Sequence, residues 1–430
     1  MSLRILVVGK SARMDCILET ISRSTHKPEL YAYTEVRHPG LFERTKEIYC
    51  GSMANVPAIV EYAKEISPSF VIIGPEEPLA LGVADELSKH GISCVGPKKI
   101  LAQLETNKVY TRDLFEVHDI PGNPEYRVFY GGDGLSTYLT RLGDFVIKPF
   151  GLTGGKGVRI FHSPSYQDGL EYCDQLFRRD GGFIVEEYLE GEEFSLQMLT
   201  DGYSTIMCPP VQDYKKAYDG NKGPNTGGMG SYSCADHLLP FLSEMDLEYA
   251  SHINNRVLTA LQEDTGHLYQ GVIYGGFIKT AKGIFVLEYN ARFGDPEAMN
   301  VLPLLQGDFV EICEGIVDGY LANVTVPVSF AHQASVCKYI VPKGYPENPV
   351  KKKIIQNIPC ATENLKVYYG SVTSMGAGLT MQGSRAIALV GFGSCVAEAG
   401  AIAEEAAASI TGPVYYRHDI GIITSGTSTP

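Results

Sequence analysis

The chain has 430 residues and a formal net charge of −14 at pH 7, with 44% hydrophobic and 20% charged residues. This length exceeds one comfortable hydrophobic core, so two to four domains are expected. The negative charge argues against nucleic acid as a partner, and no apolar run approaches the roughly 18 residues that span a membrane. Ten scattered cysteines without a C-x-x-C pair indicate reduced thiols and a cytoplasmic location.

Residues 1–105 alternate between strand-like and helix-like segments. "RILVVG" precedes the helical spacing of "KSARMDCILETISRS", and "FVIIG" follows the helical "VPAIVEYAKEI". This alternation predicts an open parallel sheet, which binds ligands at the carboxyl ends of its strands. We expect Gly9 and the turn Gly74-Pro75-Glu76 at that edge.

After about residue 105 the pattern changes to short strands separated by glycine-rich turns. "DFVIKPFGLTGGKGVRIF", residues 144–161, lacks the GK[ST] of a Walker A loop and reverses the order of a kinase glycine loop and strand lysine. Glycine destabilises strand interiors, so a glycine-dense hairpin favours close approach to a ligand. We predict that this hairpin covers nucleotide phosphates and that Lys148 contacts them; a plain hairpin with a solvated lysine is the alternative.

An acidic connector follows in "FIVEEYLEGEEFSLQML", residues 183–199. Between two lobes, such a connector can offer backbone groups to adenine and a carboxylate to ribose hydroxyls. A merely solvated acidic turn is the competing interpretation.

The segment "VLEYNARFGDPE", residues 286–297, holds the strongest group of candidate catalytic and metal-binding side chains. Side chains alternate along a strand, so Glu288, Asn290 and Arg292 share one face while Leu287 and Tyr289 point away. A carboxylate and an amide oxygen suit Mg²⁺, and arginine binds phosphate or carboxylate with two hydrogen bonds. The alternative is an exposed polar strand end with a salt bridge.

"QDYKKAYDGNKGPNTGGMGSYS", residues 212–233, combines Lys215 and Lys216 with a glycine-rich run. We predict that these lysines and the amides of "GPNTGGMG" hold phosphate groups on a loop able to close. A glycine-rich linker is the alternative. A helix over "HINNRVLTALQEDTG" and a hairpin turning at Lys282-Gly283 are expected next.

Beyond "NVTVPVSF" the chain is again strand-like in "ASVCKYIVP" and "KVYYGSV", and the Ala/Glu-rich "CVAEAGAIAEEAAASI" predicts a helix. These segments indicate a third, α+β unit.

Together, "QDYKKAYDGNKGPNTGGMGSYS", "EYNARFGDPE", "GPEEPL" and "FVIKPFGLTGGKGV" closely resemble the phosphoribosylamine–glycine ligases, or glycinamide ribonucleotide synthetases, of the ATP-grasp superfamily. The resemblance extends to "SVCKYIVPKGYP" and "YYRHDIG" near the end of the chain. It implies a multidomain protein of α/β and α+β class. Its parts would be an open parallel-sheet substrate domain over 1–105, an ATP-grasp domain over 106–322 with a mobile lid at about 120–190, and an α+β domain over 323–430.

The reaction implied by the resemblance joins glycine to 5-phosphoribosylamine in purine biosynthesis, with ATP converted to ADP and phosphate. Glycine's carboxylate is a poor electrophile, so the γ-phosphoryl group is first moved onto it and the amine attacks the resulting acyl phosphate. Such chemistry depends on positioning and charge stabilisation rather than on a protein nucleophile. ATP and Mg²⁺ or Mn²⁺ are thus implied, and we expect a monomer, with a dimer as the alternative.

Matching positions carry the family's site residues onto this chain. The catalytic residues implied are Arg292, Lys148 and Asp213. Those implied for ATP are Lys108, Lys148, Gly154, Gly155, Lys156, Glu186, Glu187, Tyr188, Leu189 and Glu193. Those implied for the other substrates are Gly9, Glu76, Lys216, Asn225, Thr226, Gly227, Gly228, Met229, Arg292, Asp295, Pro296 and Glu297. Glu288 and Asn290 are implied for the metal.

Two departures from the family pattern concern the amine substrate. The family's G-x-G-G-R-E-H after the first strand reads "GKSARMD" here, and its glycine-arginine element near the C-terminus is poorly matched at "GSRAIALVG", residues 383–391. One alternative is therefore a diverged ATP-grasp ligase that acts on a different amine. A catalytically silent nucleotide-binding module is another, against which Glu288, Asn290 and Arg292 together argue. An NAD(P) dehydrogenase is excluded because the first strand lacks G-x-G-x-x-G.

Overall fold

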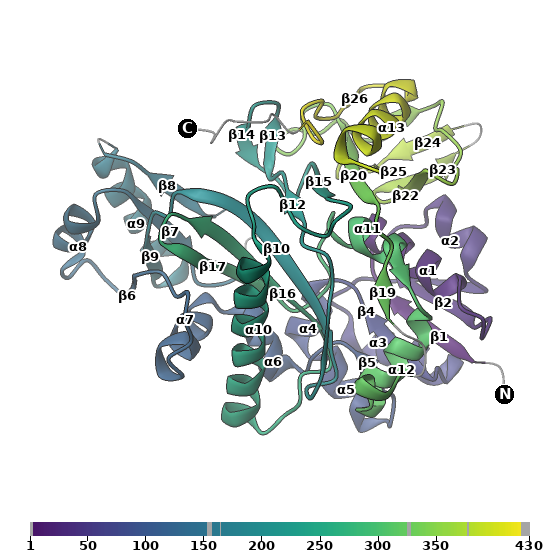
Figure 1. Cartoon of the computed structure of the whole chain (residues 1–430), viewed down its shortest axis with the longest axis horizontal. Helices are drawn as coiled ribbons and strands as arrows, with labels where there is room; N and C mark the ends of the chain where they lie inside the picture. Colours follow the sequence, from purple (N-terminus) through teal and green to yellow (C-terminus); the bar gives the residue numbers. More distant parts are fainter. Residues whose placement is uncertain (1–2, 153–156, 164, 325–327, 376–377, 423–430) are drawn as a thin grey trace.

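The computed structural model describes residues 3–152, 157–163, 165–324, 328–375 and 378–422. It confirms the predicted fold class: an N-terminal parallel sheet, a central ATP-grasp-like region with a projecting lid, and a C-terminal region of mixed strands and helices (Figure 1). No helix within the described ranges is both long and apolar enough to cross a membrane.

The N-terminal region is a five-stranded sheet in the order β3-β2-β1-β4-β5, with every pair parallel. Helices cover both of its faces, so its strands are continuous apolar runs; Ile5 to Val8 are fully buried. The strands are β1 (Arg4–Val8), β2 (Glu29–Thr34), β3 (Glu47–Cys50), β4 (Phe70–Ile73) and β5 (Cys94–Val95). The helices are α1 (Ala12–Ser22), α2 (Pro39–Arg44), α3 (Val56–Ile66), α4 (Glu76–Leu81) and α5 (Val83–Lys89).

The two predicted glycine turns lie at the carboxyl edge of this sheet, as expected. The amide of Gly9 donates to the Tyr33 carbonyl at 3.0 Å, and the amide of Gly74 donates to the Val8 carbonyl at 2.9 Å. Both turns therefore face the central region.

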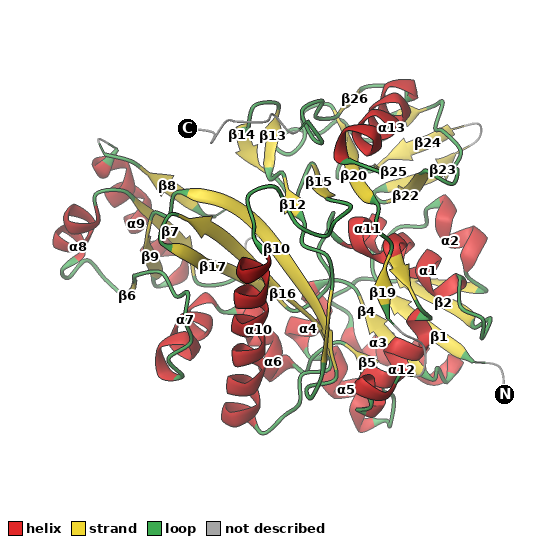
Figure 2. Ribbon diagram, in the orientation of Figure 1, coloured by secondary structure: helices red, strands yellow, loops and turns green. Residues whose placement is uncertain are grey.

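The central region is built on an antiparallel sheet in the order β11-β10-β16-β17, with the long helix α10 packed against it (Figure 2). The predicted hairpin at Lys282-Gly283 is present, because Thr280 pairs with Gly283 between β16 and β17. Ser243 and Asp246 form a capping box at the start of α10, which ends at Gly266. The elements are β10 (Gly191–Thr200), β11 (Thr205–Met207), β16 (Gly271–Thr280), β17 (Gly283–Asn290), α6 (Lys99–Thr106), α7 (Lys108–Val117) and α10 (Glu244–Thr265).

The lid is a four-stranded antiparallel sheet, β6-β9-β7-β8, with a hydrophobic cluster of its own. The predicted hairpin exists as β7 and β8, with Phe145 opposite Phe161, but its tip, including residues 153–156, lies outside the described residues. Closure of the lid over ATP stays a prediction. The elements are β6 (Tyr126–Phe129), β7 (Phe145–Pro149), β8 (Arg159–Phe161), β9 (Phe183–Glu187), α8 (Leu135–Leu142) and α9 (Tyr166–Asp180).

The C-terminal sheet takes two of its strands from the middle of the chain. Its order is β12-β15-β20-β25-β22, and β26 also pairs with β20. β12 and β15 belong to the glycine-rich segment 212–233, so this segment links the central region to the C-terminal one. The strands are β12 (Gln212–Asp213), β15 (Gly230–Ser233), β20 (Ala334–Pro342), β22 (Leu365–Tyr369), β25 (Ile387–Gly393) and β26 (Val414–Tyr415).

The remaining helices and strands complete these regions. A hairpin of β13 and β14 projects between β12 and β15, a three-stranded sheet runs in the order β21-β24-β23, and β18 pairs with β19. They are β13 (Lys216–Tyr218), β14 (Lys222–Asn225), β18 (Leu305–Gln306), β19 (Ser329–Phe330), β21 (Ile354–Ile355), β23 (Val372–Met375), β24 (Gly378–Met381), α11 (Ala298–Val301), α12 (Phe309–Asp318) and α13 (Val396–Ser409).

A buried ion pair joins the lid to the body. The guanidinium of Arg112 on α7 donates to both carboxylate oxygens of Glu186 on β9, at 2.8 and 2.9 Å, and Lys148 lies 2.7 Å from the same carboxylate. Arg112 also donates to the carbonyls of Val286 and Leu287 on β17. One arginine thus ties β9 of the lid to β17 of the central sheet.

We expect Arg112→Met to destabilise β9 by about 3 kcal/mol, because Glu186 loses its bidentate partner while it stays buried. Hydrogen exchange at the amides of residues 183–187 measures this local opening free energy. Arg178→Met is the matched control, since Arg178 forms only an exposed pair with Asp174 and its loss should cost less than about 0.5 kcal/mol. Equal protection in both variants would contradict the role of the Arg112 pair.

The same pair predicts an acid-sensitive lid. Burial opposes ionisation of Glu186, but Arg112 and Lys148 lower its pKa from 4.5 to about 2. A carboxyl with a lower pKa in the folded state stabilises the fold above its unfolded pKa and loses that contribution as the pH falls. We expect β9 protection to fall between about pH 4.5 and 2 in the wild type but to change little over that window in Glu186→Gln.

Candidate active site

The candidate site is built on one face of the central sheet. Asn290 on β17 lies opposite Tyr274 on β16, and Glu288 lies opposite Gly276. On the other face, the Tyr289 hydroxyl donates to Asn254 of α10 at 2.9 Å. The predicted alternation is present for Glu288, Tyr289 and Asn290, so Glu288 and Asn290 share the face away from α10. It is wrong for Leu287, because the register shift beside Gly276 leaves this residue unpaired and half-buried like Glu288.

Cations from separate elements surround Glu288. Burial would raise the pKa of this carboxyl, but Lys215, Lys148, Lys108 and Arg292 together lower it. The Glu288 side chain nevertheless stays 41% exposed, so it lines an open part of the site. A carboxylate and an amide oxygen among four cations fit a divalent metal bound together with phosphate groups.

Arg292 follows β17 and connects Asn290 to two other elements. Its guanidinium donates to the Asn290 side-chain oxygen at 2.8 Å and lies 3.0 Å from Glu105 and 3.6 Å from Glu76. Burial opposes protonation, yet these carboxylates raise the pKa of Arg292 above its ordinary value. Sequence reasoning missed Glu105 because "ILAQLET" carries no signal beyond helical spacing.

A second group of acids lies beside Lys215, which contacts Glu193 at 2.8 Å and Glu288 at 3.9 Å. Burial raises the pKa of Asp213 to about 7; Lys215 opposes this, whereas Glu297 and Glu193 add to it. Tyr274, which was not predicted, donates its hydroxyl to Glu297 at 2.8 Å. Asp213, Lys215, Glu288 and Glu297 thus form one interacting set.

The glycine-rich loop uses much of its backbone internally. The amide of Thr226 donates to the Lys215 carbonyl, that of Gly228 to the Thr226 hydroxyl, and that of Met229 to the Tyr214 carbonyl. Met229 is fully buried. The prediction that these three amides serve phosphate groups is therefore wrong: they shape the loop, and Lys215 and Lys216 supply its charge.

The predicted nucleotide residues lie around the joint of lid and body. Lys148 donates to the Leu287 carbonyl at 3.0 Å, and Lys108 donates to the Gly151 carbonyl at 2.8 Å. The carboxylate of Glu186 is occupied by Arg112 and Lys148, and the amide of Glu187 donates to the Glu125 carbonyl at 2.9 Å. Glu187 accepts the amide of Glu125, and Tyr188 packs edge-on against His162. Gly154, Gly155 and Lys156 lie outside the described residues.

The N-terminal edge contributes basic groups near Glu76. Arg13 is buried and donates to the Phe293 carbonyl at 2.5 Å, which links α1 to the segment after β17. Lys10 of "GKSARMD" lies 3.1 Å from Glu35 and 3.3 Å from Glu77. This edge thus meets the segment after β17 in two places: Arg13 donates to the Phe293 carbonyl, and Glu76 pairs with Arg292.

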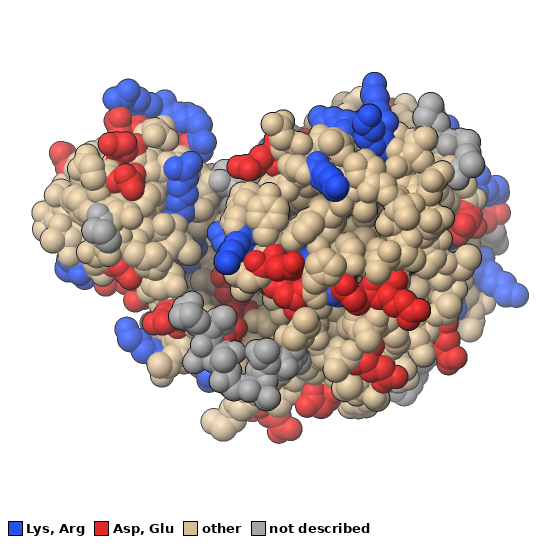
Figure 3. All heavy atoms as spheres, turned by 90° about the horizontal axis from the view of Figure 1, so that it is seen from above, with Lys and Arg blue, Asp and Glu red and all other residues tan. Residues whose placement is uncertain are grey.

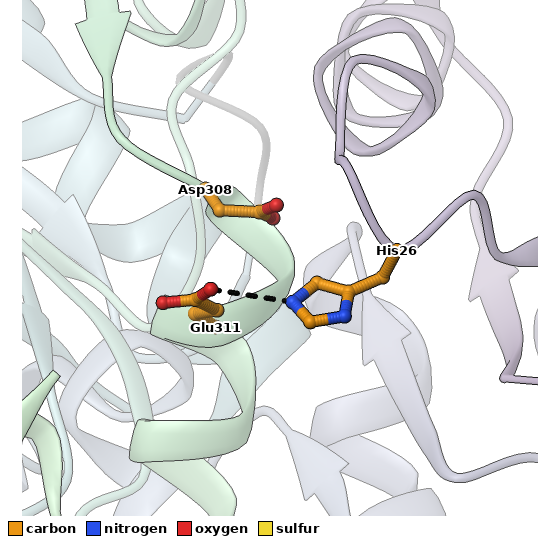
Figure 4. A group of neighbouring side chains, drawn as sticks. All are labelled: His26, Asp308 and Glu311. Atoms are coloured by element: carbon orange, nitrogen blue, oxygen red, sulfur yellow. Dashed lines mark hydrogen bonds and ion pairs between the residues drawn. The ribbon is translucent and has the colours of Figure 1, made fainter. Parts of the chain in front are cut away.

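Seen from above, the lid stands as a separate lobe beside the body, and acidic side chains gather across the middle of this face (Figure 3). A different cluster has metal-like spacing: His26, Asp308 and Glu311 are the only such group of three in the described part of the chain (Figure 4). Asp308 already caps α12 and accepts from Ser24, and His26 lies 3.2 Å from Glu311. This cluster is a contact between α12 and the loop after α1.

Comparisons with known proteins agree along the whole chain. Three family models match: the N domain of phosphoribosylglycinamide synthetase over residues 3–105, its ATP-grasp domain over 106–298 and its C domain over 335–422. The phosphoribosylamine–glycine ligase of Methanosarcina barkeri is 44% identical over 423 residues, which cover 97% of this chain and 96% of that protein. The protein of the same name from Methanocaldococcus jannaschii is 41% identical over 434 residues, with coverage of 97% and 96%.

Solved structures show the same architecture. A phosphoribosylamine–glycine ligase from Thermotoga maritima superposes with a TM-score of 0.81 at 25% identity, over 97% of this chain and 100% of that one. The biotin carboxylase domain of Hydrogenobacter thermophilus 2-oxoglutarate carboxylase, solved with MgADP, gives 0.74 at 15% identity over 97% and 92%, which shows the shared fold alone. With all three domain models matched in order, the chain belongs to the phosphoribosylglycinamide synthetase family.

Proposed function

We propose that the protein is an ATP-dependent ligase that joins glycine to 5-phosphoribosylamine, giving glycinamide ribonucleotide, ADP and phosphate in purine biosynthesis. The observation that carries this proposal is the set of Glu288, Asn290 and Arg292, with three lysines around Glu288, in a chain of this family. A cytoplasmic location and a monomeric state accompany the proposal as expectations.

In the first step, a carboxylate oxygen of glycine attacks the γ-phosphorus of ATP, and the bond to the β–γ bridging oxygen breaks. ADP leaves and glycyl phosphate forms. Lys148, Lys108 and Lys156 hold the phosphates, the backbone of residues 186–189 holds adenine, and Glu193 holds the ribose. Preorganised charges of this kind lower the barrier without a protein nucleophile.

Glu288 and Asn290 would hold the metal. Mg²⁺, or Mn²⁺ in its place, would neutralise charge on the transferring phosphoryl group when bound. Both side chains supply hard oxygen ligands on one strand face, and the amide oxygen of Asn290 is kept in orientation by Arg292.

In the second step, the amine of phosphoribosylamine attacks the acyl carbon, the carbon–oxygen bond to phosphate breaks, and the nitrogen loses a proton. Arg292 stabilises the acyl phosphate, and Glu297 with the turn 294–297 shapes its pocket. Asp213 is suited to take the proton because its pKa, raised by burial to about 7, is close to neutral pH. Gly9 and Glu76 lie at the phosphoribosyl end, and Lys216, Asn225, Thr226 and the loop 227–229 close the other side.

One observation favours a second candidate, a ligase of the same chemistry with another amine. Lys10, in the altered loop "GKSARMD", pairs with Glu35 and Glu77 at the sheet edge. These contacts alter the loop that would meet the phosphoribosyl group.

The experiment that tests the proposal is magnesium-dependent phosphate release from ATP, with glycine and freshly generated 5-phosphoribosylamine added singly and together. Release at full rate only when both are present is expected. Phosphate release at the same rate with and without phosphoribosylamine would overturn the amine assignment and favour the second candidate. No release with glycine under any condition would overturn the ligase assignment as a whole.

Glu288→Gln should lower turnover at least a hundredfold and leave the fold intact, because the amide keeps the shape but loses the charge that holds the metal. Manganese titration followed by electron paramagnetic resonance, in the presence of ADP, should show weaker metal binding. Glu86→Gln is the control, since Glu86 forms an exposed pair with Lys89 on α5. Unchanged turnover in Glu288→Gln would remove the metal assignment.

A further inference from the structure

One arginine of the C-terminal region contacts both segments that line the proposed acyl-phosphate pocket. The Nη1 of Arg385, just before β25, donates to the carbonyl of Gly227 at 2.5 Å, to that of Asp295 at 2.7 Å and to that of Gly228 at 3.3 Å. It also lies 3.2 Å from the Asp295 carboxylate. A single guanidinium therefore bridges the glycine-rich loop and the turn after β17.

Tyr339 on β20 completes this contact. Its hydroxyl donates to the Asp295 carboxylate at 2.5 Å, and the guanidinium carbon of Arg385 lies 4.7 Å from the centre of its ring. The side chains of Arg385 and Asp295 are only 16% and 5% exposed. The Asp295 carboxylate is occupied by these two partners. We therefore assign Asp295 to the contact with Arg385 and Tyr339 and not to substrate binding.

The neighbouring glycines are explained by the same close packing. A Cβ at Gly227 would lie 3.1 Å from the Arg385 guanidinium, and one at Gly228 would lie 2.5 Å from Pro296. Gly228 also has a φ of +106°, which other residues rarely adopt. The two segments can pack this tightly only because the loop carries glycine where Arg385 and Pro296 approach.

We propose that Arg385 is a positioning residue that holds the loop 225–229 and the turn 294–297 in register for activation of glycine. The proposal rests on the proposed function above and deepens it. The turn carries Glu297 and follows Arg292, whereas the loop follows Asp213 and Lys215, so a shift between them separates the groups around the acyl phosphate. The ATP residues Lys108 and Lys148 lie on α7 and β7, away from Arg385, and are unaffected.

The test compares Arg385→Met and Arg385→Lys with the wild type, with Lys338→Met as matched control. Lys338 precedes Tyr339 on β20 and is more deeply buried than Arg385, but it contacts Glu404 and the carbonyls of Arg417 and His418 instead. We expect kcat/KM for glycine to fall at least tenfold in Arg385→Met, with KM for ATP within twofold of the wild type. Arg385→Lys should recover part of the loss, and Lys338→Met should keep both constants within twofold.

Hydrogen exchange gives a readout that needs no turnover. In Arg385→Met, amides of residues 225–230 and 294–298 should exchange at least tenfold faster, while those of α10 keep their rates. Tyr339→Phe keeps the packing and removes one hydroxyl, so it should show a smaller change in exchange at the same segments. If Arg385→Met does not fold, Tyr339→Phe is measured in its place.

Two results would overturn the proposal. One is unchanged glycine kinetics together with unchanged exchange in both the Arg385 and Tyr339 variants. The other is an equal loss in Lys338→Met, which would show that any loosening of the C-terminal sheet has this effect. A wild type without glycine-dependent turnover would count against the proposed function alone, because the exchange experiment still tests the contact.

Discussion

The ion pairs of Arg292 are the interaction on which the arrangement of this site depends. A buried guanidinium destabilises a fold unless carboxylates and hydrogen-bond acceptors surround it. Arg292 obtains them from Glu105 on α6 and Glu76 of the N-terminal region, while it also bonds to Asn290. Burial raises the pKa of Glu105, and Arg292 opposes this shift. The charge balance therefore requires the N-terminal edge, α6 and β17 to meet at one point.

The central sheet then sets the spacing of the remaining groups. Gln197, Tyr274 and Asn290 lie opposite one another on three neighbouring strands, and a Cβ at Gly276 would lie 3.3 Å from the Glu288 side chain. The register between β16 and β17 shifts after Gly276, and in the shifted stretch the carbonyl of Leu287 accepts from Lys148 and Arg112. The strand that carries Glu288 and Asn290 is thus the same strand that anchors the lid.

The C-terminal region completes the site rather than standing apart from it. β12 and β15 of the glycine-rich segment are strands of the C-terminal sheet, and Arg385 contacts the loop that precedes β15. Asp295 receives Tyr339 and Arg385 from this region, while Arg13 of the N-terminal region bonds nearby to Phe293. Three stretches far apart in the chain therefore meet at the turn after β17.

Much of the site could be predicted from local patterns. The alternation of "VLEYN" placed Glu288 and Asn290 on one face, and strand–helix alternation placed Gly9 and Gly74 at a sheet edge. The roles of these residues stay predictions. Glu186 was expected to offer backbone groups to adenine, and this stays a prediction. The ion pair of its carboxylate with Arg112, 74 residues away, had no signal in the sequence. Glycines expected to expose amides proved to allow close packing, since a glycine fits both purposes equally well.

The sequence by itself determined the fold class and the family, because these depend on periodicity and on short strings with a single chemical use. Only the tertiary structure decided which charges neutralise one another. Glu105, Arg112, Tyr274 and Arg385 lie on helices, strands and turns whose local patterns are ordinary. Their importance comes from the cost of burying charge, and that cost can be assessed only when the partners are in place.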